Sequence, residues 1–385
     1  MKPFAVYPLM PINIQRASGS WVWDENDRKY LDFYGGHAVI SIGHSHPHFV
    51  ARLKDQLDRV AFYSNSVLNP LRDQLAAKVG ELSGYPDYQL FIVNSGAEAV
   101  ENALKLASFH NGRSKVIAFE RGFHGRTSAA VHVTDNPKIA ASINRGFERV
   151  ILPWNDLEAV QDQLAKEDVC ALIIEGIQGI GGVHLPAPEF LRELQSLCTK
   201  HGTLLVLDEI QSGYGRSGKF FAHQYAGIRP DLITIAKGMG NGFPIGGVMI
   251  SPKVEASFGL LGTTFGGTHL ACAAGLAVLE VIEAERLQEN ILLRGKELME
   301  GLRQFDEVVE VRGAGGMIGV ELPFSAKDFR QRLVQEFGVF TGSSSQPNTL
   351  RVLPPLSIMA NEVAVFLEAF GNCLSTHQQP VTSHA

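Results

Sequence analysis

The sequence predicts an α/β protein with a large, mostly parallel sheet and a second, smaller α+β domain. Between residues 90 and 250, short apolar runs alternate with amphipathic helical patterns, which is typical of a parallel sheet covered by helices on both faces. Beyond residue 305, strand and helix patterns continue in a shorter arrangement of their own. A chain of 385 residues is long enough for more than one domain.

The elements of the large domain are predicted in chain order. Residues 21–33 alternate around a polar turn and predict a hairpin. A clear amphipathic helix begins at Pro188 and ends before Gly202, with its apolar side chains on one stripe. Nearly continuous apolar runs predict the sheet strands at 90–94, 115–119, 171–175, 204–208, 232–236 and 247–250.

A change of pattern near residue 290 predicts the smaller domain. Strand patterns at 308–311, 317–322 and 350–352, with helical patterns at 327–337 and 361–374, follow a helical stretch over 270–305. We therefore divide the chain into an N-terminal segment and hairpin that join the small domain (1–45), a large domain (46–290) and a small C-terminal domain (291–375). The polar tail, 376–385, is expected to be disordered.

Composition and charge narrow the classes of function. The net charge is −6, and the sequence contains no long run of charged residues of one sign. Both features argue against nucleic acid or a membrane surface as the main partner. No apolar stretch is long enough to span a membrane and no secretion signal is present, so a cytoplasmic protein is expected. The four cysteines form no CxxC pair, and the spacing of His44, His46 and His48 suits a metal poorly, so no metal is predicted.

Candidate functional residues follow the predicted strands at their carboxyl ends, where open α/β sheets bind ligands. Ser95, Gly96 and Ala97 form a small-residue turn before a helix, whose free backbone N–H groups suit a phosphate, although an ordinary helix cap is the simpler interpretation. Phe123 could stack on a flat ring and Arg126 could bind a carboxylate. A core aromatic residue and a surface arginine are the simpler alternatives.

Two titratable side chains close neighbouring candidate strands. Asp208 ends the strand at 204–208, where a nearly buried acid is costly unless it faces a cation. Lys237 follows the strand at 232–236 and precedes a glycine-rich segment, and a lysine there is well placed to form an imine in a dry cavity. Their spacing in the sequence allows both side chains to meet over one ligand.

The motifs together resemble a family of fold-type I aminotransferases, the class III group that includes acetylornithine, ornithine and 4-aminobutyrate aminotransferases, with the acetylornithine enzymes as the nearest match. The resemblance covers nearly the whole chain, and the order and spacing of the motifs make it specific. The motifs are Tyr30-Leu-Asp-Phe33, Gly43-His-Ser-His-Pro47, Asn94-Ser-Gly-Ala-Glu98, Phe123-His-Gly-Arg-Thr127, Asp208-Glu-Ile-Gln211, Ala236-Lys237, Thr263-Thr-Phe-Gly-Gly267 and Leu350-Arg-Val-Leu-Pro-Pro355.

The resemblance implies a fold-type I transferase dependent on pyridoxal 5'-phosphate (PLP). Lys237 would form a Schiff base with PLP, and Asp208 would pair with the pyridine nitrogen and keep the ring an electron sink. The remaining cofactor-binding residues would be Ser95, Gly96 and Ala97 at the phosphate, Phe123 stacked on the ring and Gln211 near the ring hydroxyl.

The resemblance also implies a homodimer with shared active sites. Thr264 would reach the phosphate of the neighbouring subunit, while Thr263 would face the substrate. Arg126 would bind the substrate carboxylate distal to the reacting nitrogen, and Arg351 would bind the α-carboxylate of glutamate. His124 is better explained by packing than by catalysis.

One motif departs from the family. The usual Glu-Pro-x-Gln-Gly-Glu-Gly-Gly is replaced by Glu175-Gly-Ile-Gln-Gly-Ile-Gly-Gly182. In relatives the second glutamate can pair with the arginine that matches Arg351, which Ile180 cannot do. Arg351 is therefore expected to be open or paired with another group, and an open arginine would favour an anionic substrate tail.

The predicted reaction is the transfer of the δ-amino group of an N-acylornithine, acetylated or succinylated, to 2-oxoglutarate in arginine biosynthesis. It yields a semialdehyde and glutamate. Alternatives on the same fold are an ornithine or 4-aminobutyrate aminotransferase, or a PLP-dependent racemase, epimerase or aminomutase. A non-enzymatic PLP-binding module would need an effector domain for which the chain is expected to have no room.

Overall fold

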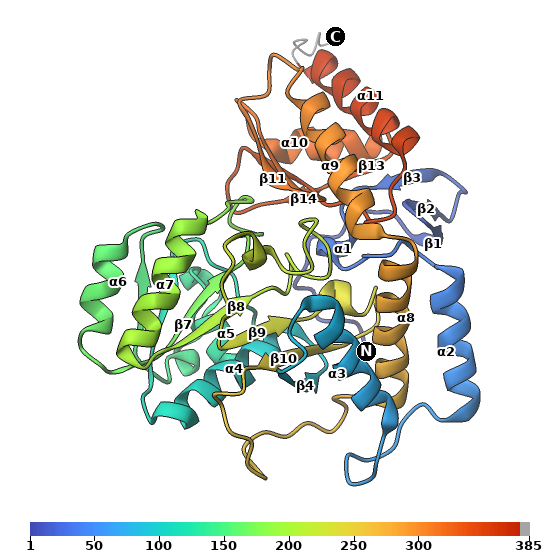
Figure 1. Cartoon of the computed structure of the whole chain (residues 1–385). Helices are drawn as coiled ribbons and strands as arrows, with labels where there is room; N and C mark the ends of the chain where they lie inside the picture. The colour runs from blue at the N-terminus through green and yellow to red at the C-terminus, as the bar shows by residue number, and fades with distance from the viewer. Residues whose placement is uncertain (378–385) are drawn as a thin grey trace.

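The computed structural model describes residues 1–377, so the predicted disordered tail lies, from residue 378 on, outside the described residues. Its largest sheet has seven strands in the order β4-β10-β9-β8-β7-β5-β6 (Figure 1). The strands are β4 (Gln89–Val93), β5 (Lys115–Phe119), β6 (Arg149–Leu152), β7 (Val169–Glu175), β8 (Leu204–Asp208), β9 (Leu232–Ile235) and β10 (Gly246–Ile250). Strands β6, β5, β7, β8 and β9 are parallel, whereas β10 is antiparallel to both of its neighbours, so the sheet is mostly parallel, as predicted.

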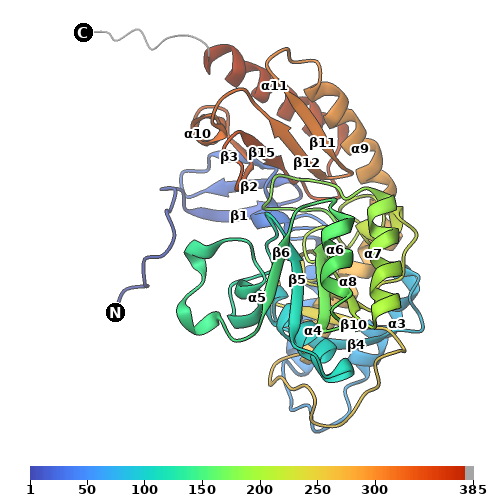
Figure 2. The ribbon, with the colours of Figure 1, turned by 90° about the vertical axis from the view of Figure 1, so that its left-hand side faces the viewer.

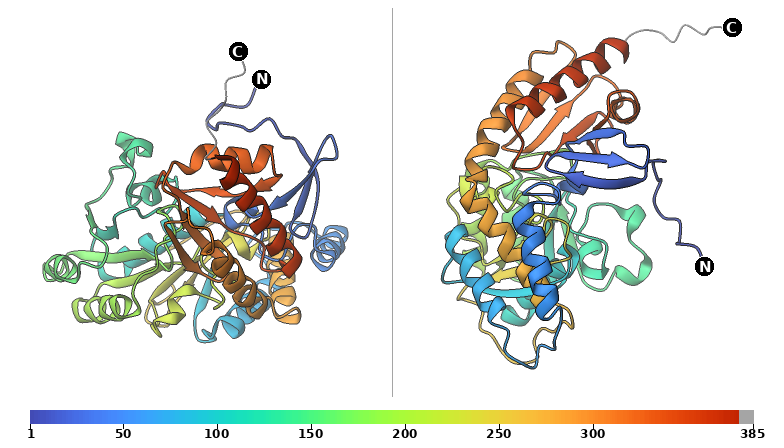
Figure 3. Two further views of the ribbon diagram at one scale, coloured as in Figure 1. Left: turned by 90° about the horizontal axis from the view of Figure 1, so that it is seen from above. Right: turned by 90° about the vertical axis from the view of Figure 1, so that its right-hand side faces the viewer.

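Helices cover both faces of this sheet, because successive side chains of a strand point to opposite faces. Val206 of β8 packs in the apolar cluster with α4 (Gly96–Asn111), while Leu205 and Leu207 pack in the cluster with α7 (Pro188–His201). The other helices of this domain are α2 (Pro47–Arg59), α3 (Pro70–Ser83), α5 (Ser128–His132), α6 (Leu157–Leu164) and α8 (His269–Ala284). Helix α2 lies beside α8, as Figure 3 shows.

The second body of the fold contains two four-stranded sheets, ordered β11-β12-β15-β14 and β1-β2-β3-β13. The strands are β1 (Ile14–Ser18), β2 (Trp21–Asp24), β3 (Lys29–Asp32), β11 (Glu310–Ala314), β12 (Met317–Glu321), β13 (Val339–Phe340), β14 (Gly342–Ser343) and β15 (Thr349–Val352). The helices are α9 (Leu287–Leu302), α10 (Ala326–Gln335) and α11 (Ala360–His377). The predicted hairpin is present as β2 and β3.

The N-terminal hairpin is joined to the C-terminal part of the chain by backbone pairing. Strand β3 pairs in parallel with β13, with Leu31 opposite Val339. Figure 2 shows β1, β2 and β3 beside the elements of the C-terminal sheet. This pairing supports the proposal that residues 1–45 belong with the small domain.

Several short elements are not predicted from the sequence. Strands β6, β13 and β14 are short. Strands β13 and β14 have two residues each, which is too few for a pattern of alternating apolar and polar residues to be recognised. The helical stretch predicted over 270–305 is divided at Arg286, whose positive φ of 51° ends α8 and starts α9. The remaining short elements are α1 (Gly35–Ala38), η1 (Pro137–Ile139), η2 (Ser142–Asn144), η3 (Ala222–Tyr225) and η4 (Lys237–Met239).

The cysteines and the three clustered histidines, for which the sequence predicts no metal, have surroundings that can be described. All four cysteines are buried as free thiols. His44, His46 and His48 turn to three different acids, Asp32, Glu285 and Glu280, rather than to a common point. Among residues 1–377, no helix combines the length and apolarity needed to cross a membrane.

Candidate active site

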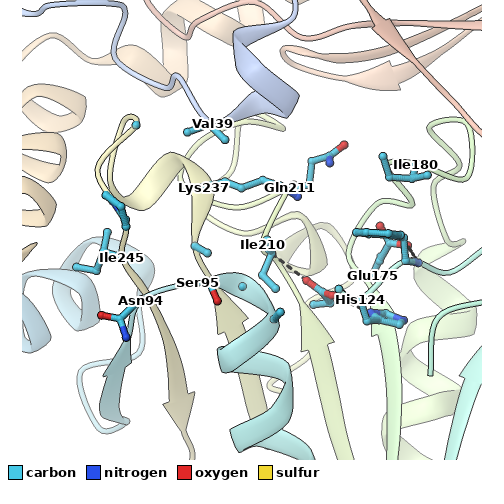
Figure 4. A pocket seen from close by; sticks show the side chains of 18 of the residues that line it. Val39, Asn94, Ser95, His124, Glu175, Ile180, Ile210, Gln211, Lys237 and Ile245 are labelled. Carbon is cyan, nitrogen blue, oxygen red and sulfur yellow. Dashed lines mark hydrogen bonds and ion pairs between the residues drawn. The ribbon is translucent and has the colours of Figure 1, made fainter. Parts of the chain in front are cut away.

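A cavity of about 300 Å³ lies where β7, β8 and β9 end and α4 begins. Most of its wall comes from the segments that directly follow these strands, as expected for an open α/β sheet. Figure 4 shows Lys237 and Gln211 in the upper part of the cavity, Ser95 at the start of the helix below them, and Glu175 and His124 to one side. The residues that line the cavity include Ser95, Gly96, Ala97, Phe123, His124, Glu175, Ile180, Asp208, Gln211 and Lys237.

Lys237 enters the cavity from the first position of η4, just after β9. Its φ of +47° is an uncommon conformation for a residue other than glycine, and such strain is typical of functional sites. Burial lowers the pKa of Lys237 to about 8, and the charges of Asp208 and Glu175 offset this effect in part. Because its Nζ has no hydrogen-bond or ion-pair partner among the described residues, this amine is available to a ligand.

Asp208 lies at the end of β8, adjacent and parallel to β9, so its carboxylate comes close to the Lys237 segment. Its Oδ1 accepts a hydrogen bond from the Ile210 backbone N–H (3.1 Å), and its Oδ2 lies 2.7 Å from His124 Nδ1. Burial alone would lower the pKa of His124, but the hydrogen bond and charge of Asp208 and the charge of Glu175 outweigh burial and raise it. His124 therefore fixes the carboxylate of Asp208 in one orientation.

Glu175 ends β7 and faces the same cavity from a buried position. Its Oε1 accepts from the backbone N–H of Phe123 (3.0 Å), and its Oε2 accepts from the backbone N–H of Gly179 (2.9 Å). One carboxyl group thus connects the aromatic segment to the loop that carries Ile180. Burial raises the pKa of Glu175 to about 7, with the nearby charge of His124 opposing this shift.

The N-terminus of α4 supplies a set of backbone donors to the cavity. Ser95 is the N-cap residue, and its Oγ accepts from the backbone N–H of Glu98 (3.2 Å). Gly96 and Ala97 occupy the first turn, where N–H groups have no acceptor within the helix. These N–H groups and the positive end of the helix dipole suit a bound phosphate.

Gln211 is the cavity residue that reaches toward the small domain. Its Oε1 accepts a hydrogen bond from Nη1 of Arg351 on β15 (2.8 Å). Arg351 is fully buried, and burial lowers the pKa of its guanidinium to about 10. The guanidinium therefore remains charged at neutral pH and lies one hydrogen bond away from the cavity wall.

Comparison with known families identifies this arrangement. The sequence model of the aminotransferase class-III family matches residues 5–374, almost the whole chain. The chain belongs to the class-III aminotransferase family. The family assignment makes the chain a PLP-dependent transaminase.

Relatives of this class-III aminotransferase match it over nearly the full length of both chains. The acetylornithine aminotransferase of Bacillus subtilis is 38% identical over 97% of the chain and 98% of the relative. The ornithine aminotransferase structure from Toxoplasma gondii superposes with a TM-score of 0.91 at 28% identity, covering 98% and 94% of the two chains. The acetylornithine aminotransferase structure from Elizabethkingia anophelis gives a TM-score of 0.84 at 28% identity over 97% and 96%.

The structure places some predicted site residues outside the cavity of this aminotransferase. Arg126 and Thr264 are exposed, and Thr263 is partly buried and accepts a hydrogen bond from Asn94 Nδ2 (3.4 Å). Arg351 contacts the cavity through Gln211. The predicted residues that line the cavity together are Ser95, Gly96, Ala97, Phe123, Asp208, Gln211 and Lys237.

Two buried groups of the cavity gain roles that the sequence does not predict. Packing is the favoured interpretation of His124 from the sequence, but the structure shows it bonded to Asp208. The sequence identifies Glu175 only as the first residue of a motif and predicts no contact for it, whereas in the structure it accepts a hydrogen bond from the backbone N–H of Phe123. Glu175 is the last residue of a predicted strand and His124 directly follows Phe123, a residue already selected; these positions are the signal that could have pointed to them.

Proposed function

We propose that this aminotransferase binds PLP in the cavity and transfers the δ-amino group of an N-acylornithine to 2-oxoglutarate. The observation that carries the proposal is the meeting of Lys237, Asp208 and the α4 N-terminus around a single cavity. The names of the relatives, acetylornithine aminotransferases, support the donor class. We place the reaction in arginine biosynthesis.

The chemistry of the cavity residues fits PLP. Three groups of the cofactor need partners: a phosphate, a ring nitrogen that is best kept protonated, and an aldehyde. The N–H groups at Gly96 and Ala97, the oriented carboxylate of Asp208 and the unpartnered amine of Lys237 are such partners. Phe123, held through its backbone N–H by Glu175, supplies an aromatic wall.

When bound, PLP would supply an electron sink for the bond that breaks at the substrate carbon. Lys237 would hold the cofactor covalently and, once displaced by the donor, would accept and return a proton at its Nζ. A pKa near 8 suits that task at neutral pH. Asp208 would keep the ring nitrogen protonated, and His124 would hold the carboxylate in the required orientation.

Substrate carboxylates would be bound by arginine side chains. We propose that Arg351 binds the α-carboxylate of 2-oxoglutarate and that Arg126 binds the carboxylate distal to the reacting nitrogen. Arg126 is exposed, so it is accessible to a substrate that enters the cavity from solvent. Two arginines suit a dicarboxylate such as 2-oxoglutarate.

We also propose that the enzyme is a homodimer with shared active sites. Large apolar side chains are exposed on two loops that lie together: Phe62, Tyr63, Val67, Leu68, Phe258 and Phe265. The rings of Phe62 and Phe265 pack at 5.5 Å, and Asn65 Nδ2 donates to the carbonyl oxygen of Thr263 (2.5 Å). Exposed apolar surface of this kind is typical of a protein interface, and it lies beside Thr264.

Half-reactions with four donors test the proposed reaction. The loaded enzyme is mixed separately with N-acetylornithine, N-succinylornithine, ornithine and 4-aminobutyrate, and the rate of change of the cofactor absorbance is recorded. Adding 2-oxoglutarate should then yield one glutamate for each semialdehyde formed. We expect an acylated ornithine to give the largest kcat/KM. A larger value with ornithine or 4-aminobutyrate would contradict the proposed donor, and turnover without glutamate would contradict an aminotransferase.

A further inference from the structure

Glu209 is a fully buried acid that directly follows Asp208 and does not line the cavity. Its Oε1 accepts from the backbone N–H of His223 (2.8 Å) and lies 2.8 Å from Nδ1 of the same residue. Its Oε2 accepts from Oγ of Ser212 (2.6 Å) and from the backbone N–H of Ala222 (3.0 Å). An ionised carboxylate accepts all of these bonds, and they offset the cost of burying its charge.

The network continues from His223 into the body of the large domain. Nε2 of His223 lies 2.6 Å from the hydroxyl oxygen of Tyr85, and the same hydroxyl donates to the carbonyl oxygen of Ile228 (3.2 Å). The guanidinium of Arg229 lies over the ring of Tyr85, with Cζ 4.6 Å from the ring centroid. Glu209 is therefore connected to the segment that follows α3, which does not line the cavity.

The backbone around Glu209 connects this network to Asp208. The backbone N–H of Ile210, one residue beyond Glu209, donates to Oδ1 of Asp208 (3.1 Å). The backbone N–H of Glu209 donates to the carbonyl oxygen of Thr234 on β9 (3.0 Å), and that of Gly176 donates to the carbonyl oxygen of Asp208 (3.1 Å). A shift of Glu209 would therefore move both the carboxylate of Asp208 and the Ile210 N–H group that orients it.

The packing leaves little room around Glu209. A Cβ atom at Gly176 would lie 2.4 Å from Oε1 of Glu209, and one at Gly213 would lie 2.7 Å from the carbonyl oxygen of Glu209. Gly176 is the position at which the usual family motif has proline. In this chain the backbone that follows Glu175 packs directly on the carboxylate of Glu209.

We propose that Glu209 is a positioning residue: it fixes the end of β8 and so holds the carboxylate of Asp208 where that carboxylate pairs with the ring nitrogen of PLP. This role rests on the proposed function, because the position of Asp208 matters only if Asp208 faces the cofactor. Glu209 does not line the cavity, so it acts through Asp208.

The absorbance of bound PLP, followed as a function of pH, reports on the ring nitrogen. A proton on that nitrogen withdraws electrons and favours loss of the proton at the bond to Lys237, so a ring without it should have an absorbance midpoint at higher pH. Glu209→Gln keeps the size of the side chain but turns one accepting oxygen into a donor. We expect the midpoint to rise by about one pH unit or more.

The kinetic constants provide a second readout for Glu209→Gln. Positioning of Asp208 affects the step that breaks a bond at the substrate carbon, whereas the groups that bind the substrate are unchanged. We expect kcat to fall by about tenfold or more, while KM for the amine donor stays within about threefold of the wild type.

Asp231→Asn is the matched control, because Asp231 is a buried acid at the opposite end of the same strand. Its Oδ2 accepts from the backbone N–H of Leu205 on β8 (2.9 Å), its Oδ1 lies 2.8 Å from Nζ of Lys253, and it does not line the cavity. Both variants should lower the free energy of unfolding. Asp231→Asn should leave the midpoint and kcat at their wild-type values, and equal shifts in the two variants would overturn the proposal.

Asp208→Asn distinguishes failure of this proposal from failure of the proposed function. It should raise the midpoint at least as far as Glu209→Gln does. A shifted midpoint in Asp208→Asn beside a wild-type midpoint in Glu209→Gln would overturn the positioning role and leave the proposed function standing. An unshifted midpoint in Asp208→Asn would show that Asp208 does not pair with the ring, and would overturn both.

Ser212→Ala keeps the test decisive if Glu209→Gln does not retain PLP. It removes a single donor to Oε2 of Glu209 and leaves the carboxylate in place. The midpoint should rise in the same direction by a smaller amount, about 0.3 pH units or more. A midpoint equal to that of the wild type would then overturn the positioning role.

Discussion

At the ends of β7 and β8, two buried acids face one cavity with different partners. Asp208 is bonded to the imidazole of His124, whereas Glu175 accepts two backbone N–H groups and has a pKa raised to about 7. The sequence predicts Asp208 and Lys237 because each closes an apolar strand, a local signal. It does not predict the contact between Glu175 and Phe123, because the two residues come from different strand ends and meet only in the folded sheet.

The raised pKa of Glu175 predicts a pH-dependent stability. Its folded-state pKa, about 7, lies above the ordinary value of 4.5, so between these pH values the folded protein keeps a proton that the unfolded chain has lost. This contribution is fully present below about pH 4.5 and is lost as the pH rises through 7. The free energy of unfolding of the cofactor-free protein should therefore fall by up to about 3 kcal/mol between pH 5 and 8.

Urea unfolding of the wild type and of Glu175→Gln at several pH values measures this effect. The variant has no proton to lose at this position, so its stability should decline less over the same range. Parallel curves for the two proteins would show that another group carries the pH dependence.

At the scale of elements, the direction of β10 shapes the end of the cavity where α4 begins, the proposed site of the phosphate. The connection from Lys237 to β10 is too short for a crossover, so β10 must return antiparallel to β9. The sequence predicts this strand by its apolar run, but not its insertion between β9 and β4. The order of strands depends on packing across the whole sheet, which a local pattern does not record.

Gly246, the first residue of β10, lets this strand approach the start of α4. A Cβ atom there would lie 2.8 Å from the carbonyl oxygen of Ser95 and 3.0 Å from that of Ile235, both backbone atoms. Gly246→Ala should therefore move the Ser95 turn, lowering the free energy of unfolding by about 1–3 kcal/mol and weakening PLP binding. Denaturant unfolding and a PLP titration measure the two effects.

Gly146→Ala is the matched control, because a Cβ atom at Gly146 meets nothing within 4 Å. This control should leave the stability and the PLP affinity close to those of the wild type. If Gly246→Ala behaved like Gly146→Ala, the close approach of β10 would not support the phosphate turn.

At the scale of the whole molecule, the proposed homodimer would explain the position of Thr264. Thr264 is exposed and does not line the cavity of its own chain. The family resemblance is what assigns it to the neighbouring phosphate, since no local pattern in the sequence encodes a contact between subunits. The two-body fold is predicted well from the sequence, because long apolar strands and amphipathic helices are local features. The pairing of β3 with β13 is not predicted, because it joins segments that are distant in the sequence.

Mixing two inactive variants tests the shared site. Lys237→Ala subunits and Thr264→Ala subunits are combined under conditions that allow exchange, and aminotransferase activity is followed. If Thr264 acts across the interface, a heterodimer has one site with both defects and one with neither, so activity should recover. Verified exchange without recovery would place Thr264 in its own subunit's site or outside the site.

The central claim is that Lys237 carries PLP in the cavity at the end of β9, and borohydride reduction tests it most directly. Reduction of the loaded enzyme followed by peptide mapping should place the cofactor covalently on Lys237, at one per chain. Lys237→Arg, which keeps the positive charge, should retain no covalent label after the same treatment. A label on a different lysine, or no label on the wild type, would show that Lys237 does not carry PLP.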